Sequence, residues 1–163
     1  MKKAATLLLA CTLAFYGYSQ QSEGTTQSQK NDSEEKTSAF LGTIGGMSAA
    51  YILTAQDHIE TQIKTVERNR ADSALAIPKL TVQKNICNLL QEQLNKLQSS
   101  NAIGPDSPDH SFIVDLKTTL SLIIKEVDLG ISYIRDNSSN KKTQYDNSSL
   151  EASKKIKELL GME

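Results

Sequence analysis

Residues 108–136 carry an unbroken helical pattern that constrains the fold more than any other feature of the chain. Their apolar residues recur in steps of three and four, at Ile113, Leu116, Leu120, Ile123, Val127, Gly130 and Ile134. This spacing places side chains on one face of an α-helix. Ser107 as N-cap and Pro108 at the first helical position mark its start. A long helix with a wide apolar face must bury that face, so the sequence predicts packing against other helices.

Three further segments show helical periodicity, namely residues 39–77, 79–99 and 148–160. Ser148 is the expected N-cap of the last one, because Glu151 follows three residues later and completes a capping box. Residues 137–147 are polar and predict a linker. No strand-like alternation occurs, so the expected fold class is all-α. We expect a helical bundle or an elongated helical hairpin, with four helical segments and antiparallel neighbours.

Helix 79–99 shows one apolar stripe, which we expect to be its buried side. The stripe consists of Val82, Ile86, Leu89, Leu90, Leu94 and Leu97. Cys87 lies on the same helix and is expected to be buried, since free cysteine is among the most buried residue types. The alternative for Cys87 is an intermolecular disulfide.

Pro78 decides how the first two helices are connected. Proline lacks a backbone donor and disfavours helical geometry at the preceding residue. A break at Pro78 would give a compact helical hairpin, whereas a kink would leave one rod of about 90 Å over residues 39–99. Thr81 offers a new N-cap, so the sequence favours the break. Residues 67–72 are expected to form a solvated face of the first helix.

Residues 1–19 have the pattern of a bacterial secretory signal peptide. Lys2 and Lys3 form a cationic start, an uncharged apolar run follows, and small residues precede the expected cleavage site. Cys11 offers an alternative, because Leu8–Leu9–Ala10–Cys11 resembles the lipobox at which bacterial lipoproteins are lipidated. The first pattern predicts a periplasmic or secreted protein, and the second predicts an outer-membrane lipoprotein.

Residues 20–38 contain no aliphatic or aromatic side chain. Such a segment has nothing to bury, so it is expected to be a disordered polar tether. The all-helical domain is then expected to cover residues 39–163.

The composition argues against most chemistries. The formal net charge of −1 disfavours a nucleic-acid partner. His58 and His110 lack a second His or Cys at a ligand spacing, so we expect neither a metal nor another cofactor. We find no nucleophile elbow and no phosphate-binding glycine loop. Glu60, Glu67 and Glu126 are expected on solvated helix faces, so the sequence predicts a protein that is not an enzyme and has no small-molecule substrate.

Residues 39–55 are the most unusual stretch, because they carry no charge and contain small residues four apart. Gly42, Gly46 and Ala50 form this small-residue repeat. Such spacing lets helices approach closely, so we expect these residues, together with Gly130, to lie at a helix–helix interface. The alternative is contact of residues 39–55 with a membrane.

These features together predict an exported, non-catalytic helical protein. It would act through a protein partner or self-association in the cell envelope or outside the cell, as an adaptor, a part of a secretion or conjugation apparatus, or a surface-binding protein. The alternatives are a membrane-active or membrane-associated protein that uses residues 39–55, and a lipoprotein anchored at Cys11.

Overall fold

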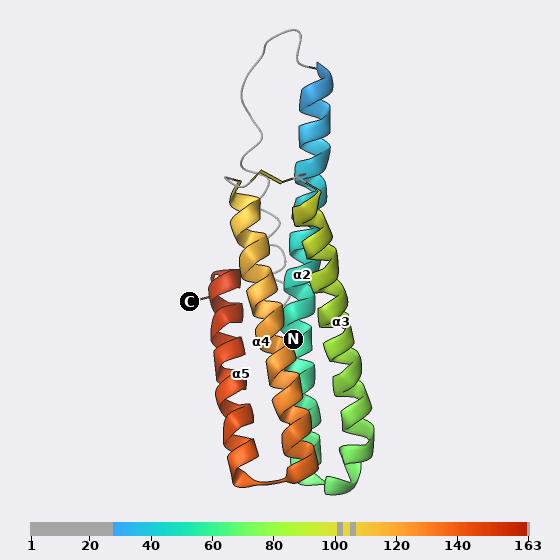
Figure 1. Cartoon of the computed structure of the whole chain (residues 1–163), viewed down its shortest axis with the longest axis vertical. Helices are drawn as coiled ribbons and strands as arrows, with labels where there is room; N and C mark the ends of the chain where they lie inside the picture. Colours follow the sequence, from blue (N-terminus) through green and yellow to red (C-terminus); the bar gives the residue numbers. More distant parts are fainter. Residues whose placement is uncertain (1–27, 101–102, 105–106, 163) are drawn as a thin grey trace, which may run out of the picture. The chain divides into compact units, whose positions relative to one another are not determined.

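The computed structural model describes residues 28–100, 103–104 and 107–162, and every element in this part is helical (Figure 1). The elements are α2 (Ser28–Arg68), the 3₁₀ turn η1 (Arg70–Asp72), α3 (Ser73–Ser99), α4 (Pro108–Asp136) and α5 (Ser139–Leu160). The described residues contain no strand, so the all-α class is confirmed. The predicted signal peptide, Cys11 and residues 20–27 of the predicted tether lie outside the described residues.

The chain divides into two compact units, Met1–Ser48 and Ala49–Glu163. Of the first unit, the structure describes the amino-terminal part of α2, from Ser28 onward. This start lies ahead of the expected residue 39 and within the polar segment predicted to be a tether. Two Lys, two Glu and one Gln stand among residues 28–38 and have high intrinsic helix propensity, which a search for buried apolar residues does not detect.

The second unit holds the rest of α2 together with α3, α4 and α5, which lie side by side (Figure 1). Fully buried side chains from all of these helices form its core: Ile52, Ile59, Ile63, Leu80, Leu116, Leu120, Ile123, Val127 and Ile156. Polar contacts also join α2 to its neighbours. The Tyr51 hydroxyl donates to the Gln83 carbonyl at 3.2 Å, and Gln56 Nε2 donates to the Ser149 carbonyl at 3.3 Å.

The break between the first two helices lies at residues 69–72, so the prediction of a break at Pro78 is wrong in its position. Asn69 leaves the helical conformation, with φ −145° and ψ 106°, and its side chain accepts a hydrogen bond from the Ala71 amide. Arg70 Nη2 donates to the Ile134 carbonyl at 2.6 Å, which ties this turn to the end of α4. Pro78 lies inside α3. Because the chain reverses at η1, α2 and α3 form a hairpin and not a single rod.

The segment predicted as a linker, residues 137–147, is mostly helical. Asn137 ends α4 in the left-handed conformation at φ 56°, and Ser138 is the N-cap of α5. Ser148, the predicted N-cap, is buried within α5, so that prediction is wrong. Tyr145 explains the difference, because its buried ring anchors the first turns of α5 to the core although its sequence neighbours are polar.

Candidate functional site

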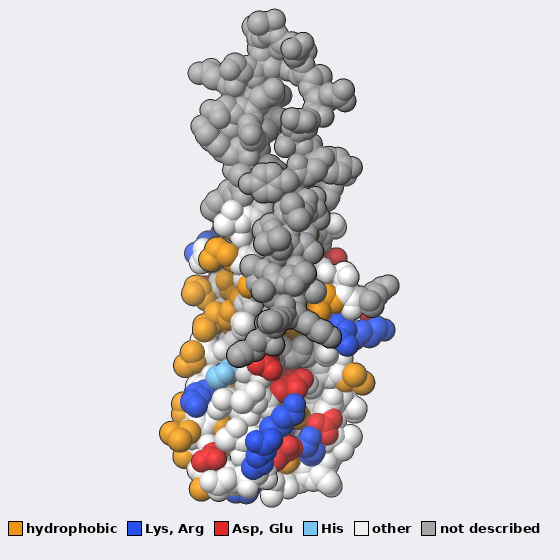
Figure 2. All heavy atoms as spheres, turned by 180° about the vertical axis from the view of Figure 1, so that it is seen from behind, with side chains coloured by type: hydrophobic (Ala, Val, Ile, Leu, Met, Phe, Trp, Pro, Cys, Tyr) orange, Lys and Arg blue, Asp and Glu red, His pale blue; other side chains and the backbone are white. Residues whose placement is uncertain are grey.

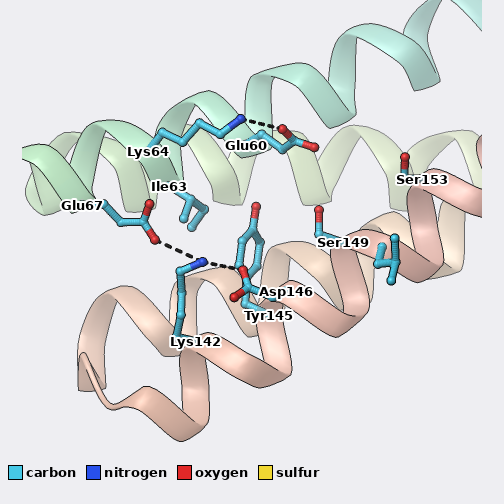
Figure 3. A pocket seen from close by; sticks show the side chains of 10 residues that line it. Glu60, Ile63, Lys64, Glu67, Lys142, Tyr145, Asp146, Ser149 and Ser153 are labelled. Carbon is cyan, nitrogen blue, oxygen red and sulfur yellow. Dashed lines mark hydrogen bonds and ion pairs between the residues drawn. The ribbon is translucent and has the colours of Figure 1, made fainter.

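A pocket of about 300 Å³ lies between α2 and α5 (Figure 3). Ten residues line it: Glu60, Ile63, Lys64, Glu67, Lys142, Tyr145, Asp146, Ser149, Leu150 and Ser153. Figure 3 shows the Tyr145 ring extending from α5 toward α2, between Lys142 and Ser149. The wall of the pocket therefore combines acids, lysines, two serines and two aliphatic side chains around one aromatic ring.

The charged groups of this pocket pair with one another, although three acids against two lysines leave a formal charge of −1. Lys64 Nζ lies 2.8 Å from the Glu60 carboxylate, and Lys142 Nζ lies 3.2 Å from that of Glu67. Lys142 also pairs with Asp146 on its own helix, and its ammonium group lies 5.6 Å from the centre of the Tyr145 ring. Exposed ion pairs of this kind contribute little binding energy for a ligand, because each charge already has a partner.

Glu126 of α4 is fully buried, so its predicted place on a solvated helix face is wrong. Within the described residues, neither of its carboxylate oxygens has a hydrogen-bond partner. Burial raises the pKa of Glu126 to about 7, the charge of Glu60 adds to the rise, and the nearby Ser149 hydroxyl acts against it. Burial and the charge of Glu126 also raise the pKa of Tyr145. Glu126 is therefore a proton-binding group near neutral pH, behind the pocket and not on its lining.

Gly130 lies at a close approach of α4 to both α2 and α5. A Cβ atom at this position would lie 3.0 Å from Ile63 Cδ1 and 3.4 Å from Tyr145 Cδ2. Contacts this short leave little room for a side chain, so glycine permits the packing here.

The other small residues predicted at an interface have no such neighbours in the described part of the chain. A Cβ atom at Gly42 or Gly46 would meet no described heavy atom within 4 Å. Ala50 is exposed. An interface at these residues stays a prediction.

The residues considered for metal binding are not brought together. His58 and His110 are each half-buried on different helices. In the part of the chain that the structure describes, no group of three or more His, Cys, Asp or Glu side chains is placed to hold a metal ion. Nor does any described helix have both the length and the apolar character that crossing a bilayer requires.

The buried side of α3 differs from the predicted one. The structure buries Ala76, Leu80, Cys87 and Leu94, which confirms the burial of Cys87. Val82, Ile86 and Leu89 were expected inside but are exposed. At 3.6 residues per turn, the exposed set lies about 120° around the helix from the buried set. Helix α3 therefore has two apolar stripes, of which one faces the core and the other is exposed.

The exposed stripe of α3 is the most distinctive surface of the second unit. The exposed fractions are 67% for Leu75, 56% for Val82, 36% for Ile86 and 54% for Leu89. Figure 2, which views the molecule from behind, shows a row of hydrophobic side chains along the edge that α3 occupies. With the polar residues between and beyond them, they form a continuous series in alternating steps of four and three: Leu75, Lys79, Val82, Ile86, Leu89, Gln93 and Lys96. We call this series the α3 seam.

Comparison with known proteins gives no matching family model, no similar curated protein and no similar solved structure. A function for this chain is therefore inferred from its own surface and chemistry.

Proposed function

We propose that this is a non-catalytic helical protein that acts through protein–protein contact, with the α3 seam as its contact surface. The observation that carries the proposal is the exposure of Leu75, Val82, Ile86 and Leu89 in one row. Leaving apolar surface in water costs about 25 cal/mol per Å², and rows of exposed apolar side chains mark interaction sites. Their alternating steps of four and three match the spacing with which helices pack in coiled coils.

The proposal includes a location in the bacterial envelope or outside the cell, which the signal-peptide pattern of residues 1–19 supports. A role as an adaptor, in a secretion or conjugation apparatus, or in surface binding agrees with a small helical body that presents one apolar helix face. Lipidation at Cys11 and membrane contact through residues 39–55 stay alternative predictions.

The proposal is tested by site-specific photo-crosslinking in the cells that make the protein. A photoreactive amino acid in place of Val82 is expected to give a protein adduct of defined mass, because this side chain would lie in the contact. The same amino acid in place of Leu150, which is exposed on α5, is the matched control and is expected to give none. If Val82 gives no adduct, or no more than Leu150 does, the α3 seam is not a contact surface.

A further inference from the structure

We propose that the partner of the α3 seam is a second copy of this chain, bound with the two α3 helices antiparallel. The inference rests on the proposed function, since it names the partner of the same surface. It follows from the order of apolar and charged residues along the seam.

The seam is apolar in its middle and polar toward its carboxyl end. Val82, Ile86 and Leu89 form the apolar centre, while Lys79 interrupts it on one side and Lys96 closes it on the other. In the heptad notation of coiled coils, Lys79 and Ile86 stand at position a. Val82, Leu89 and Lys96 stand at position d. A partner helix must therefore supply apolar residues at the centre and accommodate lysines near both ends.

A parallel pair of α3 helices fails this requirement. Equivalent positions face each other in a parallel pair, so Lys79 would oppose Lys79 and Lys96 would oppose Lys96. Two like charges at one layer are destabilising. The seam therefore argues against parallel self-association.

An antiparallel pair places apolar residues opposite one another at the centre of the seam when the two-fold axis lies near residue 84. In this register Val82 packs against Ile86 of the second copy, and the symmetry repeats the contact. Lys79 lies opposite Leu89 of the second copy, where its aliphatic stem covers the leucine and its ammonium group reaches water.

The same register pairs opposite charges at both ends of the seam. Asp72, the N-cap of α3 at the end of η1, precedes Leu75 by three residues, so the register brings it close to Lys96 of the second copy. Among the described residues, neither Asp72 nor Lys96 forms an ion pair within the chain. Two intermolecular pairs per dimer would thus form without breaking existing ones, which gives the surface charge complementarity to itself.

The test is sedimentation equilibrium of the protein purified from the cells that make it. The wild type is expected to dimerise, and Ile86→Gln is expected to raise the dimer dissociation constant about a hundredfold, because symmetry removes two apolar contacts. Leu150→Gln is the matched control, since Leu150 is exposed but lies outside the seam. Equal melting temperatures of the variants and the wild type show that each variant is folded.

A charge exchange tests the register. Lys96→Glu is expected to weaken the dimer about tenfold, because it places two acids opposite each other at both ends. Adding Asp72→Lys to Lys96→Glu is expected to restore the wild-type dissociation constant. A wild type that stays monomeric, or a double variant no tighter than Lys96→Glu, overturns the inference. If a photoreactive residue at Val82 captures a different protein, the second copy is the wrong partner although the proposed function stands; if it captures nothing, both fail.

Discussion

Leu120→Asp is expected to abolish the folded state of the second unit. Leu120 is buried in the centre of α4, and removing a buried leucine side chain alone costs about 2–5 kcal/mol of stability. The aspartate adds an unpaired buried charge to this loss, and total stabilities are typically about 5–15 kcal/mol. The measurement is thermal melting followed by circular dichroism, in which the variant is expected to show no cooperative transition. Ile123→Asp is expected to behave in the same way, because Ile123 is also fully buried on α4.

Val114→Asp is the matched control for this prediction. Val114 lies on the same helix but is exposed, so its replacement is expected to change the melting temperature by a few degrees at most. A cooperative transition of Leu120→Asp near the wild-type temperature would show that the α4 stripe does not form the core.

Glu126→Met is expected to stabilise the protein by roughly 3 kcal/mol above pH 7, because it removes a buried and unpartnered carboxylate. The pKa of Glu126 is about 7 in the folded protein, against 4.5 for an ordinary glutamate. Between these two values the folded state therefore holds a proton that the unfolded state has lost. The free energy of unfolding of the wild type is expected to fall as the pH rises through this window. Denaturant unfolding between pH 4.5 and 8 measures this slope.

Two further variants show whether the slope belongs to Glu126. Glu60 raises the pKa of Glu126 in the folded state through its charge, so in Glu60→Gln the decrease in stability is expected to end at lower pH and to be smaller. Glu151→Gln removes an exposed carboxylate on α5 that pairs with Lys125, and is expected to leave the profile in place. A Glu126→Met variant with the same pH profile as the wild type would contradict the burial of an ionisable Glu126.

The parts of the fold that the sequence predicts best are those with local physical causes. Helix α4 begins at Pro108 as expected, because the Ser107 hydroxyl accepts the Asp109 amide hydrogen at 3.2 Å, an interaction within three residues of chain. The break before α3 has a local and a long-range contact: the Asn69 side chain accepts the Ala71 amide hydrogen, and Arg70 donates to the Ile134 carbonyl, far away in the sequence. The presence of proline predicts the break at residue 78, but this prediction overlooks the capping side chain of Asn69 and cannot include the contact to Ile134.

The sequence also fails to predict which face of α3 is exposed and that Glu126 is buried. The sequence shows the apolar residues of α3, but the packing of the other helices against α3 determines which of its two apolar stripes faces the core. Glu126 could have been noticed, because Ile123 and Gly130 lie three and four residues away on the same buried side of α4. Periodicity places Glu126 on the buried side, whereas the usual preference of a carboxylate for water assigns it to the surface, and its predicted solvated position follows the residue type.

The central claim is that the α3 seam binds a second copy of the chain in antiparallel orientation, and disulfide cross-linking tests it most directly. In the proposed register the two Asn85 residues lie on either side of the two-fold axis, separated along the direction of the helices by about 3 Å. The two Leu75 residues would be separated along the axis by about 27 Å, far beyond the roughly 7 Å between Cα atoms that a disulfide can join. Every variant in this experiment also carries Cys11→Ser, so that buried Cys87 is the only native cysteine left.

Under mild oxidation, Asn85→Cys is expected to give a covalent dimer in high yield. Leu75→Cys is expected to give no more covalent dimer than the control protein, which carries Cys11→Ser alone. The double variant Leu75→Cys with Gln93→Cys is expected to cross-link, because these positions face each other across the antiparallel pair. Cross-linking of Leu75→Cys alone, or no cross-linking of Asn85→Cys, would contradict the account.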